Sequence, residues 1–141
     1  MFTDKEIRYH NLYFDMAQRI AEMSYAVKLK VGSIIVKDGN VISFGFNGTP
    51  AGFNNNCEIL DNGNLKTIDE VLHAESNAIL KAAKQGSSTD KTSLYTTIAP
   101  CMQCAKLIAQ AGIKDVFYKF EYKNDLGIQL LEKCNIPVYR I

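Results

Sequence analysis

Apolar side chains recur at helical spacing in the first part of the chain. Five of them advance in steps of four and three residues: Leu12, Met16, Ile20, Met23 and Val27. This stripe predicts an amphipathic helix. The period then changes, because VGSIIV (31–36) and VISFGF (41–46) are runs of β-branched and aromatic residues on either side of KDGN. An Asp-Gly pair between two such runs predicts a β-hairpin.

The rest of the chain alternates between predicted helices and strands. Residues 47–66 are rich in Gly, Asn and Asp and indicate a long loop, while TIDE (67–70) has the form of a capping box that opens a helix ending at Gly86. Further elements follow in order: a strand at 92–98, a helix from Pro100 to Gly112, a strand at 115–120, a helix at 125–134 and a strand at 137–141. Five strands alternating with helices predict a three-layer α/β domain. Its five-stranded mixed sheet should carry helices on both faces, and its last strands should be parallel.

Composition and charge exclude several classes of protein. The 141 residues are 47% hydrophobic and 22% charged, which is typical of one globular domain. With 16 Lys and Arg against 15 Asp and Glu, nothing indicates a general affinity for nucleic acid or for an anionic membrane. We see no signal peptide and no membrane span, and the four cysteines are better interpreted as free or metal-bound thiols than as a disulfide framework. The expected location is the cytoplasm.

Four residues carry candidate chemistry. His73 stands two positions before Glu75, and Cys101 and Cys104 follow Pro100 directly. His73, Cys101 and Cys104 offer three zinc ligands, and a zinc ion with three protein ligands keeps a fourth position open for catalysis. Glu75 would then lie beside the metal as a general acid and base.

Simpler interpretations of the same residues stay open at this point. The histidine fits a satisfied helix residue, the glutamate fits a solvated carboxylate, and the cysteines fit apolar filler or half of a structural zinc site. A redox dithiol at a helix start is a further alternative. The geometry adds a condition, because His73 and Glu75 would lie about 200° apart around a continuous helix. We therefore expect the helix to begin nearer His73, which leaves the Thr67 capping box to a separate short turn.

The chain resembles a known enzyme family. His73-Ala74-Glu75 and Pro100-Cys101-Met102-Gln103-Cys104 match the His-x-Glu and Pro-Cys-x-x-Cys signature of zinc nucleobase deaminases. The stretches VGSIIVKDGNVISFGFNGTPAGF, LHAESNAIL and LYTTIAPCMQCAKLIAQAGIKDVFY extend a resemblance to deoxycytidylate (dCMP) deaminases, of the viral and bacterial type, over nearly the full length. The resemblance implies a single deaminase domain over residues 1–141 with a cytidine-deaminase-like fold. It also implies zinc on His73, Cys101 and Cys104, with Glu75 as the proton shuttle.

The reaction implied by the resemblance is hydrolytic deamination of dCMP to dUMP and ammonia by zinc-activated hydroxide, which feeds the synthesis of thymidylate. The backbone at Ala74 would contact the pyrimidine, Asn47 the deoxyribose, and Tyr118 would lie near the nucleotide. Relatives place a basic residue after the first helix to bind phosphate; here Lys28 and Lys30 would take its place. Asn47 also suits a plain turn, and both lysines suit a solvated surface.

The resemblance also implies partners. We expect one zinc ion per chain, since loop 47–66 holds a single cysteine and no histidine. A homo-oligomer, by resemblance a hexamer, and regulation by dCTP and dTTP together with Mg²⁺ are further expectations. Alternative substrates are cytidine, dCTP, guanine and a tRNA adenosine, and the balanced charge argues against tRNA. A zinc-stabilised or redox protein without catalysis is the alternative from a different class.

Overall fold

A five-stranded sheet forms the centre of the computed structural model, which describes residues 1–141. In spatial order its strands are β2 (Asn40–Phe46), β1 (Gly32–Lys37), β5 (Ser93–Ile98), β6 (Asp115–Phe120) and β7 (Val138–Arg140). Strand β1 is antiparallel to both β2 and β5, whereas β5, β6 and β7 are parallel to one another. The predicted five-stranded mixed sheet and its parallel last strands are confirmed, and the structure adds two strands outside this sheet.

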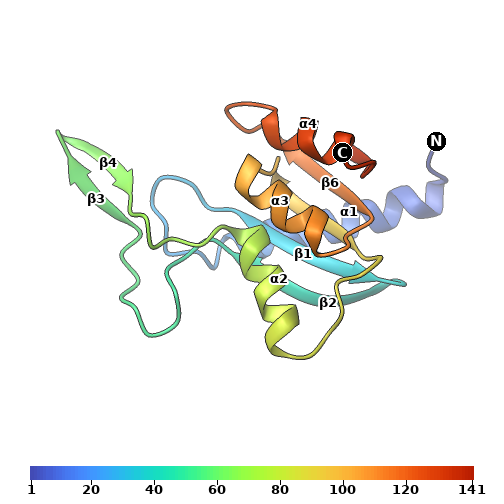
Figure 1. The fold of residues 1–141 in the computed structure, drawn as a ribbon, viewed down its shortest axis with the longest axis horizontal. Coiled ribbons are helices and arrows are strands. Elements are labelled where there is room, and N and C mark those ends of the chain that lie inside the picture. Colours follow the sequence, from blue (N-terminus) through green and yellow to red (C-terminus); the bar gives the residue numbers. More distant parts are fainter.

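Helices cover both faces of this sheet (Figure 1). One face carries α1 (Asp4–Ala21), and the other carries α2 (Ala74–Lys84), α3 (Met102–Gln110) and α4 (Leu126–Lys133). Side chains of β1 alternate between the two layers, because Ile34 packs in the cluster beneath α1 and Ile35 in the cluster beneath the other three helices. The three-layer α/β prediction is therefore confirmed. No helix combines the length and the apolar character that crossing a bilayer requires.

The first helix differs from its prediction at both ends. It begins at Asp4, where Thr3 and Glu6 form a capping box, and it ends at Ala21. Its buried residues are Tyr13, Phe14, Ala17 and Ala21, whereas Leu12 of the predicted stripe is 49% exposed. The prediction followed long aliphatic side chains, but the buried face of α1 combines two aromatic residues with two alanines. A Cβ atom on Gly32 would lie 2.6 Å from the Ala21 nitrogen, so the two backbones are in direct contact.

The predicted loop over 47–66 contains a second hairpin. Strands β3 (Glu58–Asp61) and β4 (Asn64–Thr67) pair around Asn62 and Gly63, whose φ angles are 51° and 80°. Asn-Gly is a strong signal for this turn, but the flanking strands are almost entirely exposed and show no alternation of buried and solvent-facing residues. The hairpin projects from the body of the molecule (Figure 1).

The helix expected to open at Thr67 begins seven residues later. Thr67 is the last residue of β4, where its backbone pairs with Glu58, so the interpretation of TIDE as the start of this helix is wrong. A short turn follows, closed by a hydrogen bond from the Val71 N–H to the Ile68 carbonyl. Helix α2 then begins at Ala74 with His73 as its N-cap, which confirms the start near His73.

Candidate metal centre

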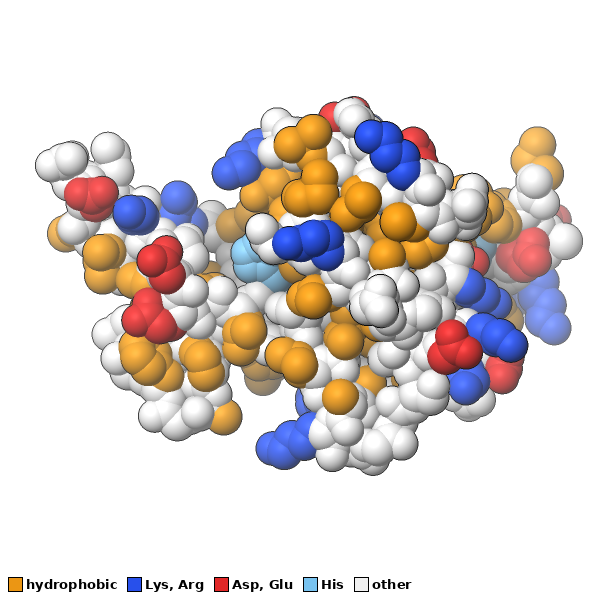
Figure 2. All heavy atoms as spheres, viewed as in Figure 1, with side chains coloured by type: hydrophobic (Ala, Val, Ile, Leu, Met, Phe, Trp, Pro, Cys, Tyr) orange, Lys and Arg blue, Asp and Glu red, His pale blue; other side chains and the backbone are white.

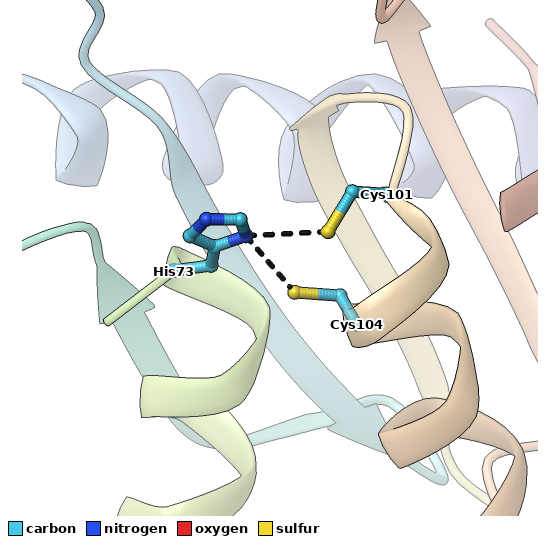
Figure 3. A group of neighbouring side chains, drawn as sticks. All are labelled: His73, Cys101 and Cys104. Atoms are coloured by element: carbon cyan, nitrogen blue, oxygen red, sulfur yellow. Dashed lines mark hydrogen bonds between the residues drawn. The ribbon is translucent and has the colours of Figure 1, made fainter. Parts of the chain in front are cut away.

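The N-termini of two helices meet at one point. His73 is the N-cap of α2 and Cys101 is the N-cap of α3, and neither side chain hydrogen-bonds to its own helix. Both side chains are therefore free to point toward each other. The His73 Nδ1 atom lies 3.3 Å from the Cys101 sulfur and 3.3 Å from the Cys104 sulfur (Figure 3). The sequence-predicted ligands thus converge, although 27 residues separate the histidine from the first cysteine.

The spacing of these three atoms fits a tetrahedral zinc ion. With Zn–N near 2.0 Å and Zn–S near 2.3 Å, a ligating nitrogen and sulfur lie about 3.6 Å apart. The three candidate atoms lie within 4.8 Å of one another, and both N···S distances fall close to that value. One imidazole and two thiols are ligands that zinc favours, and three of them leave a position open. The chain therefore positions His73, Cys101 and Cys104 to hold a metal ion.

Electrostatics at the site favour a cation. The pKa of Cys101 is lowered to about 3, first because the Cys104 thiol donates a hydrogen bond to its sulfur and then because of the neighbouring His73. The pKa of Cys104 is raised, because its hydrogen bond to Cys101 favours the protonated thiol and because it is buried. Two thiolates this close repel each other, so full ionisation of the pair calls for a positive ion between them. The partial positive charge of the two helix N-termini adds to the same effect.

Glu75 lies in the first turn of α2, beside the candidate ligands. Its side chain is only 4% exposed, and burial raises the pKa of its carboxyl group. It nevertheless lines the same cavity as His73 and Cys101. A carboxyl group whose pKa is raised and which faces a cavity is suited to taking up and releasing a proton.

Helix α2 is held firmly against β2, which fixes His73 and Glu75. The Ser43 hydroxyl donates to the Ala78 carbonyl at 2.7 Å, and the Asn77 side-chain amide donates to the Phe46 carbonyl at 2.8 Å. These bonds join side chains to backbone carbonyls on adjacent elements. The metal site is therefore built on a rigid part of the fold rather than on a loop.

A cavity of about 870 Å³ adjoins the candidate metal centre. Most of the sequence-predicted site residues line it: Lys28, Lys30, Asn47, His73, Ala74, Glu75 and Cys101. Cys104 lies buried behind this wall. Tyr118 is not brought to the cavity. Its side chain is 8% exposed within β6, where its hydroxyl faces the Glu121 carboxylate at 3.5 Å.

The side chain of Asn47 is engaged with the segment that carries the two lysines. Its amide nitrogen donates to the Leu29 carbonyl at 2.7 Å, and its oxygen accepts from the Val31 N–H at 2.9 Å. Asn47 therefore fixes residues 29–31 at the cavity wall. One amide N–H and one oxygen lone pair remain for a further partner.

Several cavity-lining residues were absent from the sequence-based set: Glu58, Lys66, Phe120, Tyr122 and Lys123. The sequence could have indicated Tyr122, because it follows the parallel strand β6 and ligands commonly bind at the carboxyl ends of parallel strands. Glu58 and Lys66 lie on the hairpin that was predicted as a loop, and nothing in their local sequence indicates that they face a cavity.

Comparisons with known proteins agree with this site. The model of the cytidine and deoxycytidylate deaminase zinc-binding region matches residues 7–120. The chain is 40% identical to ComE operon protein 2 of Bacillus subtilis over 93% of this chain and 70% of that protein. It is 32% identical to the deoxycytidylate deaminase of Enterobacteria phage T4 over 89% of this chain and 86% of that enzyme.

A solved structure extends the similarity to the whole fold. The dCMP deaminase of cyanophage S-TIM5, crystallised in complex with dCMP and dUMP, superposes with a TM-score of 0.90 at 40% identity. The match covers 99% of this chain and 100% of the cyanophage chain. The matched region spans all three candidate ligands. The chain is thus a member of the zinc-dependent cytidine and deoxycytidylate deaminase family.

Proposed function

We propose that residues 1–141 form one deaminase domain that hydrolyses dCMP to dUMP and ammonia and so feeds thymidylate synthesis. The observation that carries this proposal is the convergence of His73, Cys101 and Cys104 beside Glu75 at the wall of a cavity large enough for a nucleotide. The similarity to the cyanophage and T4 dCMP deaminases supports the choice of substrate.

In this proposal Glu75 moves the protons of the reaction. A zinc ion held by His73, Cys101 and Cys104 would act as a Lewis acid and would lower the pKa of water at the open position to about 7. Glu75 accepts a proton from water and delivers it to N3 of the cytosine ring, then transfers a second proton to the departing amine. Water thus adds oxygen at C4, the C4–N bond breaks, and ammonia leaves. The low exposure of Glu75 keeps its carboxyl group out of bulk solvent during these transfers.

Further side chains of the cavity would orient the nucleotide. The backbone at Ala74 would contact the pyrimidine, and the free hydrogen-bonding capacity of Asn47 would serve the deoxyribose. Lys28 and Lys30 would attract the 5′-phosphate, because both are exposed and line the cavity. Tyr118 does not line the cavity itself, but its hydroxyl lies 3.5 Å from the carboxylate of Glu121, which does, so its proposed place is near the nucleotide without direct contact.

A direct comparison of substrates tests the proposal. Ammonia release by the zinc-loaded protein is measured from dCMP, CMP, dCTP and deoxycytidine at equal concentrations. We expect the highest kcat/KM with dCMP. A higher value with deoxycytidine or CMP would assign the same site to a different cytosine compound, and release from none of the four would contradict a cytosine deaminase.

Assembly and regulation belong to the same proposal. Ile7, Tyr9 and Leu12 of α1 are each at least 45% exposed, and such side chains are suited to contacts in a homo-oligomer. Sedimentation measurements would distinguish a monomer from the proposed hexamer, and dCMP saturation curves with dCTP, dTTP and Mg²⁺ would test regulation.

Metal analysis tests the proposed single zinc ion per chain. The proposed location is the cytoplasm, where such a reaction would supply thymidylate synthesis.

A further inference from the structure

Two lysines outside the 28–30 segment line the candidate active-site cavity. Lys66 lies on β4 of the projecting hairpin, and Lys123 lies in the connection between β6 and α4. Both are exposed, and neither takes part in an ion pair. With Lys28 and Lys30 they bring cations from three separate segments of the chain to one cavity. Figure 2 shows Lys and Arg side chains both over the hairpin and over the body beside it.

Two acidic side chains of the cavity, Glu121 and Glu58, contact groups other than these lysines. The Glu121 carboxylate pairs with Arg140 at 2.8 Å. The Glu58 carboxylate accepts hydrogen bonds from the backbone N–H groups of Val27 and Lys28 at 2.9 and 3.0 Å. None of the four cavity lysines forms an ion pair with these carboxylates, so their ammonium groups are available to an anionic ligand group.

The Glu58 contact also explains how the hairpin reaches the cavity. Glu58 stands opposite Thr67 and next to the Ile59–Lys66 pair in the β3–β4 register. By binding the backbone at residues 27 and 28, its carboxylate fastens the hairpin to the segment that carries Lys28. Both strands of the hairpin are almost entirely exposed, so the Glu58 carboxylate provides one of its attachments to the cavity wall.

From these observations we propose that Lys66 and Lys123 bind the 5′-phosphate of the nucleotide and that Glu58 positions Lys66 for this contact. The inference deepens the proposed function, because it assigns the preference for a nucleoside monophosphate to the β3–β4 hairpin and to the β6–α4 connection. An ammonium group is a point charge on a flexible stem, so several lysines can share one phosphate dianion.

A comparison of dCMP with deoxycytidine distinguishes a loss of phosphate binding from a general loss of catalytic activity. We would measure kcat/KM for dCMP and for deoxycytidine, which lacks the phosphate, with Lys66→Met and Lys123→Met in the zinc-loaded full chain. A hydrogen bond between an ammonium group and a phosphate is charge-assisted, but both lysines are exposed to solvent, so each variant should lose about tenfold in kcat/KM with dCMP. The value for deoxycytidine should stay unchanged. Lys114→Met is the matched control, because Lys114 is exposed but does not line the cavity, and it should leave both values unchanged.

Unchanged dCMP kinetics in both variants, or equal losses with the two substrates, would overturn the inference. Its failure is distinct from failure of the proposed function, because wild-type turnover of dCMP tests the latter alone. For Glu58, replacement by Gln keeps an oxygen acceptor for the two N–H groups, whereas Ala removes it. Glu58→Ala should lower kcat/KM for dCMP about as much as Lys66→Met does. Glu58→Gln should retain most of the wild-type kcat/KM for dCMP. Equal values for the two Glu58 variants would refute the positioning role.

Discussion

Gly45 allows helix α2 to lie directly on strand β2, and replacing it with alanine should disturb the active site. A Cβ atom at this position would lie 2.5 Å from the Ala78 nitrogen and 3.0 Å from the Asn77 carbonyl carbon. Ordinary contact between such atoms needs about 3.5 Å. Because both neighbours are helix backbone atoms, no side chain can rotate away, and α2 must move by about 1 Å.

The loss of stability expected for Gly45→Ala follows from this displacement of α2. Overpacking of a well-packed interior costs about 1–3 kcal/mol, so the free energy of unfolding should fall by that amount. Helix α2 also carries Glu75 in its first turn and His73 as its N-cap. A misplacement of 1 Å at a catalytic group lowers activity by about 100-fold. We therefore expect kcat of Gly45→Ala to fall by about 100-fold while the protein remains folded.

Urea denaturation and ammonia release from dCMP measure the two effects, and Gly48→Ala is the control. Gly48 lies three residues further along, and a Cβ atom there would meet nothing within 4 Å. The control should keep both the unfolding midpoint and kcat. A Gly45→Ala protein with wild-type stability and wild-type turnover would refute the inferred contact between the two backbones.

Three further perturbations test the site and the fold. Glu75→Gln should keep its zinc but lose about 10²–10⁴ in kcat, since the amide cannot carry protons; a variant that turns over dCMP normally would contradict the shuttle role. Removal of zinc with a chelator, or Cys104→Ser, should abolish ammonia release and lower the melting temperature, and added Zn²⁺ should restore only the chelated wild type. Burial lowers the pKa of His10 from 6.5, so the unfolded chain binds its proton more readily and stability should fall as the pH drops below that value. Urea midpoints at neutral and mildly acidic pH should show a smaller fall for His10→Asn, and an identical fall would exclude this histidine as a source.

Local patterns in the sequence were sufficient for much of the fold and for the metal ligands. The Asp-Gly turn, the glycine stops at Gly86 and Gly112 and the strand runs all depend on interactions between near neighbours along the chain. His73 and Glu75 can act on one site only if the helix begins near His73, and this predicted start agrees with α2, which begins at Ala74. The ligands themselves were recognisable because zinc accepts a narrow set of side chains.

The spacing of large apolar side chains gave the wrong buried face and bounds for α1 and did not reveal the exposed β3–β4 hairpin. Helix α1 buries Tyr13 and Phe14 together with Ala17 and Ala21, whereas Leu12 of the predicted stripe is exposed. The β3–β4 hairpin buries little on either strand, so its sequence resembles a loop except for the Asn-Gly turn.

The sequence by itself determined the order of the main-sheet strands and their helices, the glycine stops at Gly86 and Gly112 and the kinds of ligand, because each depends on atoms a few residues apart. The tertiary structure decided which distant segments share the cavity. The order β2-β1-β5-β6-β7 and the attachment of the hairpin through Glu58 bring Lys66, Tyr122 and Lys123 to the cavity that His73 also lines. Tyr118, by contrast, is buried within β6. Such neighbours depend on the register and packing of whole elements, and no local period or spacing encodes them.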